Sequence, residues 1–87
     1  MTNIARRVHK VVVDEAGLER TALGFSDDLT AVHGVDDLDL MKIAMRLEEV
    51  FGVELSDDDL QQERTVAHCV DLVRDGLEPA QFVREEQ

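Results

Sequence analysis

The 87-residue sequence has few of the residues that small domains use for cross-linking or for sharp turns: one Cys, one Pro, three Phe, and neither Trp nor Tyr. A single cysteine, Cys69, excludes an internal disulfide and a thiolate metal site, since both need at least two thiols. No apolar run approaches the ~20 residues of a membrane-spanning helix. The basic N-terminus is not followed by the apolar stretch of a secretory signal. We therefore expect a cytoplasmic protein that does not insert into membranes.

Positive charge is also scarce. Nine Lys and Arg stand against twenty Asp and Glu, which gives a formal net charge of -11. Such a chain repels phosphate, so we expect no binding to nucleic acid. Eleven of the acids lie within residues 27–59, beside only Lys42 and Arg46. A field of this kind attracts basic partners, although a solvated surface also explains a run of charge.

The periodicity of the apolar residues, which with Ala and Cys make up 44% of the chain, predicts an all-α fold. Helical spacing predicts three longer helices, over roughly 3–15, 38–51 and 66–76, and a short helix over 56–62. Residues 17–37 have no sustained period and predict a long first loop. The expected fold is a small four-helix bundle over residues 1–76, followed by a loose tail over 77–87. The expected caps are Thr2 or Asn3, Asp36 or Asp37, Ser56 and Thr65. The glycines expected to end helices are Gly17, Gly52 and Gly76.

The predicted helix over 38–51 has an apolar arc too wide for an ordinary surface helix. We expect most of this arc, including Met41 and Met45, to be buried in the bundle; the alternative is an exposed apolar edge for a partner. The opposite face has a polar stripe of Asp39, Lys42, Arg46 and Glu49. Asp39–Lys42 and Arg46–Glu49 are i, i+3 neighbours and can pair within the helix, which predicts a nearly neutral stripe.

No set of residues predicts an enzyme or a metal site. His9 and His68 are expected at the surface or at an edge, and His33 alone lies near the start of the 38–51 helix. Cys69 lies on an apolar stripe and is expected to be a buried, inert thiol. The acids at 57–59 lack the glycine and glutamate of a calcium loop, and helix capping explains them better.

At residues 33–55 the sequence resembles the acyl carrier proteins. The residues His33-Gly34-Val35-Asp36-Asp37-Leu38 are similar to that family's Gly-x-Asp-Ser-Leu motif. Leu47-Glu48-Glu49-Val50-Phe51-Gly52 is similar to its Leu-Glu-Glu-x-Phe-Gly run. The resemblance covers roughly residues 4–75 and implies the helical bundle expected above. It also implies that the helix over 38–51 recognises partner enzymes. The residues that we expect to bind partners are Asp36, Asp37, Leu38, Asp39, Met41, Lys42, Met45, Arg46 and Glu48.

Asp37 occupies the position at which the resemblance implies a serine esterified by 4′-phosphopantetheine. A carboxylate has no hydroxyl to form that phosphodiester, so we expect no cofactor on this chain unless residue 37 is Ser in the native protein. One hypothesis is a monomeric carrier-like protein that docks on enzymes of fatty acid, polyketide or related biosynthesis without a prosthetic group. A second is a genuine carrier whose serine at position 37 was substituted. A third is an acidic interaction module unrelated to acyl metabolism.

Overall fold

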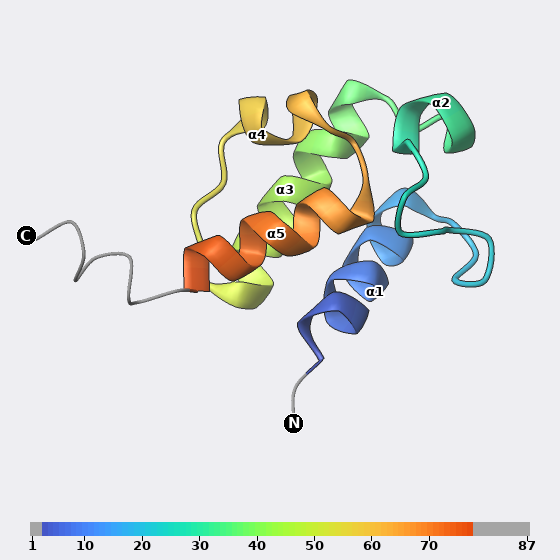
Figure 1. Ribbon diagram of the computed structural model, residues 1–87. Coiled ribbons are helices and arrows are strands. Elements are labelled where there is room, and N and C mark those ends of the chain that lie inside the picture. The colour runs from blue at the N-terminus through green and yellow to red at the C-terminus, as the bar shows by residue number, and fades with distance from the viewer. Residues whose placement is uncertain (1–2, 78–87) are drawn as a thin grey trace, which may run out of the picture.

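The computed structural model describes residues 3–77, and the described residues form helices without any strand (Figure 1). The helices in chain order are α1 (Ile4–Ala16), α2 (Leu29–His33), α3 (Asp37–Phe51), α4 (Asp57–Gln62) and α5 (Val66–Leu77). The three longer helices agree with the predicted ones, so the all-α bundle is confirmed. None of the described helices is long and apolar enough to cross a membrane. Residues 78–87, and with them nearly all of the predicted tail, lie outside the described residues, as does Thr2.

Local capping explains where α1, α3 and α4 begin. The backbone N–H of Arg6 donates to Oδ1 of Asn3 at 3.0 Å, so Asn3 caps α1. Ser56 caps α4 in a capping box: the N–H of Asp59 donates to Oγ of Ser56 at 3.3 Å, and the N–H of Ser56 donates to Oδ2 of Asp59 at 3.0 Å. The cap of α3 is Asp36, and Asp37 is the first helical residue. The predicted alternative of Asp37 as the cap is therefore wrong.

Two further expectations about helix boundaries are wrong. The predicted long loop contains α2, a helix of 5 residues that is too short to show a period in the sequence. Gly17 and Gly52 end α1 and α3 in the left-handed conformation, each with φ 68°. Gly76, in contrast, lies inside α5, which continues to Leu77. A Cβ on Gly76 would stand 2.8 Å from Cβ of Val53, so this glycine allows α5 to approach the link that follows α3.

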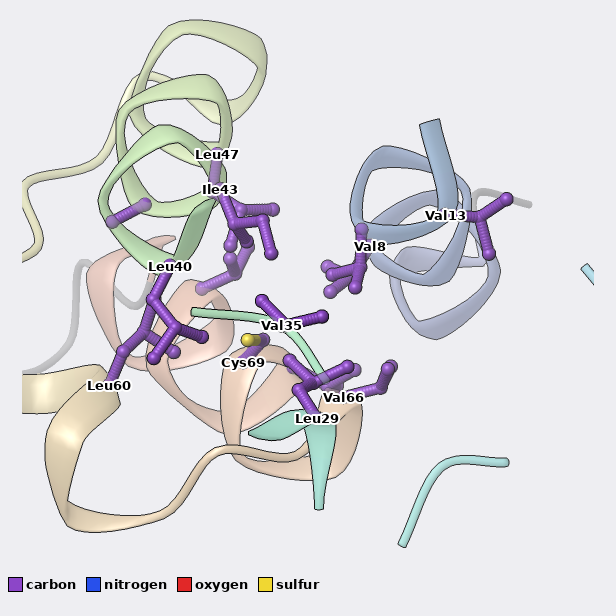
Figure 2. Close-up of a cluster of buried hydrophobic side chains, with 14 of the residues drawn as sticks. Val8, Val13, Leu29, Val35, Leu40, Ile43, Leu47, Leu60, Val66 and Cys69 are labelled. Atoms are coloured by element: carbon purple, nitrogen blue, oxygen red, sulfur yellow. The ribbon is translucent and has the colours of Figure 1, made fainter. Parts of the chain in front are cut away.

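The core lies between α1, α3 and α5 (Figure 1). Side chains such as Val8 of α1, Ile43 of α3 and Cys69 of α5 point toward one another, with Leu29 and Val35 from the connecting segment beside them (Figure 2). Most of the residues that α1 and α5 bury in the core are valines. Among the described residues no Phe belongs to the buried core, although Phe51 packs against it from a partly buried position. The largest fully buried side chains are Leu29, Leu40, Ile43, Leu47, Leu60, Val8, Val12, Val66, Val73 and Cys69.

The apolar arc of α3 is divided between the core and the surface. Four residues face inward, namely Leu40, Ile43, Ala44 and Leu47. Four other apolar side chains are exposed, namely Leu38, Met41, Met45 and Val50. The expectation that the bundle buries most of this arc, with both methionines in the core, is therefore wrong. Packing against α1, α4 and α5 occupies only part of the circumference of α3, so the remaining apolar edge stays at the surface.

Candidate functional site

The candidate site lies where the chain turns from α2 into α3. Gly34 ends α2 with φ 70°, a left-handed conformation that costs glycine little. The N–H of the buried Val35 then donates to the carbonyl oxygen of Leu29 at 3.0 Å and fixes the turn. The N–H of Asp39 donates to Oδ1 of Asp36 at 2.9 Å and starts α3. This geometry places Asp37 at the first position of α3 with its side chain exposed.

The carboxylate of Asp37 makes one long contact with α4. Nε2 of Gln61 donates to Oδ1 of Asp37 at 3.5 Å, and a guanidinium nitrogen of Arg64 donates to Oε1 of Gln61 at 2.9 Å. This chain of contacts connects the start of α3 with the end of α4 across 24 residues of sequence. At 3.5 Å the first of the two bonds is weak, so Asp37 remains available to a partner.

Exposed apolar side chains continue the site along α3. Leu38 is 58% exposed and Met45 is 56% exposed, and Met41 lies between them along the helix. We call this surface the α3 face. It comprises the predicted partner-binding residues Asp36, Asp37, Leu38, Asp39, Met41, Lys42, Met45, Arg46 and Glu48. All belong to α3 or its cap, and seven of the nine are exposed, while Asp39 and Glu48 are half-buried.

Glu48 has an internal role on this surface. The backbone N–H of Leu55 donates to Oε2 of Glu48 at 2.8 Å. The carboxylate thereby holds the extended link between α3 and α4. Since this bond already uses one of its oxygens, Glu48 has less capacity to bind a partner than the sequence suggested.

The two bases of the α3 face differ in their surroundings. A nitrogen of Arg46 lies 3.1 Å from Oε1 of Glu49, as predicted, and Nε of Arg46 lies 3.8 Å from Oε2 of Glu15 on α1. Arg46 is therefore neutralised within the molecule. The predicted pair of Asp39 with Lys42 is not among the ion pairs of residues 3–77. Lys42 consequently presents an exposed positive charge among acids.

A histidine–carboxylate pair stabilises the connection that leads to the site. Nε2 of His33, the last residue of α2, donates to Oδ2 of Asp27 at 3.0 Å, and the N–H of Gly24 donates to the same oxygen at 2.9 Å. The hydrogen bond from His33, and then that from Gly24, lowers the pKa of Asp27 from its usual value of 3.8. The position of His33 next to Gly34 suggested its proximity to the site, but no pattern in the sequence indicated Asp27 as its partner.

The other candidate groups have structural positions. His9, expected at the surface, is only 8% exposed and its Nε2 donates to the carbonyl oxygen of Leu23 at 2.9 Å. Nε2 of His68 donates to the carbonyl oxygen of Asp59 at 2.9 Å. Cys69 is buried, as expected, and burial raises the pKa of its thiol to about 12. In the described part of the chain, no three His, Cys, Asp or Glu side chains gather where they could hold a metal ion.

The sequence also matches a known family over most of its length. Residues 6–73 match the family described as the phosphopantetheine attachment site. The match includes α1 from its first turn, all of α2, α3 and α4, and α5 through the last of its buried valines, Val73. It therefore spans the whole packed core as well as the α3 face.

Proposed function

Because this chain belongs to the phosphopantetheine attachment site family, we propose that it is a carrier-like docking protein that works without a prosthetic arm. Its partners would be cytoplasmic enzymes of fatty acid, polyketide or related carrier-dependent biosynthesis. The observation that carries this proposal is Asp37. This acid takes the attachment position of the resembling motif, exposed at the first turn of α3 and beside the exposed Leu38.

The side chain of Asp37 does not fit a phosphopantetheine group attached through serine. Attachment needs a hydroxyl that attacks the pyrophosphate of coenzyme A, and Asp37 offers a carboxylate instead. The described hydroxyl residues near the turn belong to other elements: Thr30 lies in α2, and Ser56 is occupied as the cap of α4. No step of the proposed function therefore passes through the group.

The docking role is supported by the composition of the α3 face. Protein interfaces commonly have an apolar centre surrounded by polar groups, with methionine enriched. Here Leu38, Met41 and Met45 supply exposed apolar area, while Asp36 and Asp37 supply negative charge at one end. Basic partner surfaces would be attracted to that end and oriented by it.

Mass spectrometry tests the absence of the arm. The chain is incubated with coenzyme A and a permissive phosphopantetheinyl transferase, and its intact mass is measured. We expect no change for the wild type and a gain of one phosphopantetheine for Asp37→Ser. Asp36→Ser is the matched control, because serine caps a helix as well as aspartate does but stands one residue away from the attachment position. A mass gain in the wild type would contradict the proposal.

The same experiment addresses the second hypothesis, in which a native serine at position 37 was substituted. Efficient modification of Asp37→Ser together with acyl loading by a carrier-dependent ligase would favour a genuine carrier. Modification without acyl loading by the enzymes tested would favour the armless docking protein.

A competition assay tests docking directly. Excess chain is added to an acyltransferase that is loading its own carrier, and inhibition is measured. We expect Leu38→Ala and Met45→Ala each to weaken inhibition about five-fold, as for a central interface residue. Leu77→Ala is the control, since Leu77 is also exposed but lies at the end of α5. Absence of inhibition across several carrier-dependent enzymes would instead support an acidic module unrelated to acyl metabolism.

A further inference from the structure

A pocket of about 580 Å³ lies between the first half of α1 and the loop that follows it, and none of its lining residues belongs to the α3 face. Its volume lies in the range of sites for small molecules, about 300–1,000 Å³. We call it the arginine pocket. The residues that line it are Asn3, Ala5, Arg6, His9, Arg20 and Phe25.

The charge of this pocket is opposite to that of the protein. Two arginines line it and no acid does, although the chain has a net charge of -11. Neither Arg6 nor Arg20 forms an ion pair with an acid of residues 3–77, whereas Arg46 and Lys10 do. At about 0.15 M salt, charges beyond roughly 8 Å are screened, so the two guanidinium groups determine the local attraction despite the acidic total.

Phe25 adds a flat apolar wall that the fold holds in place. Phe25 is 43% exposed, and its ring stacks on the ring of His9 with 5.2 Å between centroids and 22° between planes. Nε2 of His9 in turn donates to the carbonyl oxygen of Leu23 at 2.9 Å. On the other side, the N–H of Ala67 in α5 donates to the carbonyl oxygen of Phe25 at 3.0 Å. The aromatic wall is thus fixed to two helices before any ligand arrives, which reduces the entropic cost of binding.

We propose that the arginine pocket binds a small anion carried on a planar ring, of the class of nucleoside monophosphates. The planar forks of Arg6 and Arg20 match phosphate oxygens, which accept paired hydrogen bonds from guanidinium groups. The exposed part of Phe25 offers an aromatic surface on which a base can stack. Phosphate alone would leave that surface unused, and an uncharged nucleoside would leave both arginines without a partner. This inference does not depend on the docking function, because none of the pocket residues belongs to the α3 face.

Adenosine 5′-monophosphate is the probe, titrated into the 15N-labelled full chain at about 0.15 M salt and followed by amide chemical shifts. We expect saturable shifts centred on Arg6, Arg20 and Phe25, with a dissociation constant on the order of 1 mM. Adenosine and inorganic phosphate, titrated separately, should each bind more weakly. Equal binding of inorganic phosphate would overturn the class of ligand, and absence of localised shifts at 10-fold higher concentration would overturn the site.

Variants separate the pocket from general charge effects. Arg6→Gln and Arg20→Gln should each weaken binding about two- to five-fold, and Phe25→Ala about five-fold or more. Phe25→Leu is a second variant that keeps an apolar side chain against His9, should the alanine variant fold poorly. Arg74→Gln removes the same charge from an exposed position on α5 outside the pocket, and it should leave the affinity unchanged. A loss in Arg74→Gln as large as that in Arg6→Gln would overturn the proposal.

Discussion

Replacing His9 with alanine should destabilise the whole domain, although Arg6, Arg7 and Lys10 lie close to this residue in the sequence of α1. The variant loses the hydrogen bond to the carbonyl oxygen of Leu23, about 1 kcal/mol, and the stacking on Phe25, about 0.5–1.5 kcal/mol. The lost burial of the ring atoms adds about 1 kcal/mol. The expected cost is therefore about 2.5–3.5 kcal/mol, against roughly 4–13 kcal/mol for the stability of a domain of this length.

Urea unfolding followed by far-ultraviolet circular dichroism measures this loss, because a chain without Trp or Tyr has little useful intrinsic fluorescence. The midpoint of thermal unfolding should fall by roughly 10–28 °C. His9→Phe keeps a ring without the donor, and His9→Gln keeps a donor without the ring, so each should lose about 1–2 kcal/mol. Lys10→Ala, at an exposed neighbour on the same helix, should change stability by less than about 0.5 kcal/mol. An alanine variant as stable as Lys10→Ala, or a His9→Phe variant as stable as wild type, would refute the reasoning.

Three further outcomes follow from particular contacts. Gly76→Ala should destabilise by about 1–2 kcal/mol in urea unfolding, since its Cβ would overlap Val53 and overpacking costs more than helix propensity returns; a stabilised variant would contradict this. The lowered pKa of Asp27 means that its pairing with His33 stabilises the fold above pH 3.8 and ceases to do so as the pH falls through the folded pKa. The stability difference between wild type and Asp27→Asn should therefore shrink on acidification, and a constant difference would argue against it. Cys69 should react with iodoacetamide at pH 8 only after unfolding, because its thiol is buried with a pKa of about 12; rapid labelling of the native protein, measured by mass, would disagree.

Local patterns were sufficient to predict the longer helices and most of their ends. Asn3, Asp36 and Ser56 act as caps within their own first turns, and Gly17 and Gly52 need only their own positive φ. These features depend on residues three or four positions apart, so a single sequence contains them. The residues of the α3 face could be named together as a predicted partner-binding surface for the same reason, since they share one helix, but the exposure of Met41 and Met45 was not expected.

Features held by distant contacts were missed. α2 has 5 residues and no period, yet the N–H of Leu29 donates to the carbonyl oxygen of Arg64 at 2.7 Å and the side chain of Leu29 is fully buried. His9 looks like a surface residue until the loop places the carbonyl oxygen of Leu23 beside it. The contact of Gln61 with Asp37 spans two helices in the same way. Such pairings follow from how the chain packs, and neither propensity nor periodicity encodes them.

The site prediction was weakest where an acid could serve either the fold or a partner. Glu48 and Asp39 are both predicted from the sequence to bind a partner, but the structure uses Glu48 to hold the backbone N–H of Leu55. Arg46 and Lys42 likewise look equivalent, and only Arg46 pairs with acids of the described chain. The charged side chains of this face that are available to a partner are therefore those that do not already form contacts within the fold.

The fold makes little use of the side chain of Asp37, and this makes the modification experiment decisive. Its carboxylate is exposed and has one 3.5 Å contact with Gln61, and its favourable interaction with the helix dipole contributes at most about 1 kcal/mol. Asp37→Ser should consequently fold as the wild type does, with a change in stability below about 1 kcal/mol by circular dichroism. Since α3, its cap Asp36 and the core remain intact, failure of the transferase to modify this variant could not be attributed to unfolding. Such a failure would mean that this chain differs from a working carrier in the surface that the transferase contacts. Lys42 is the first residue of that surface to exchange for glutamate.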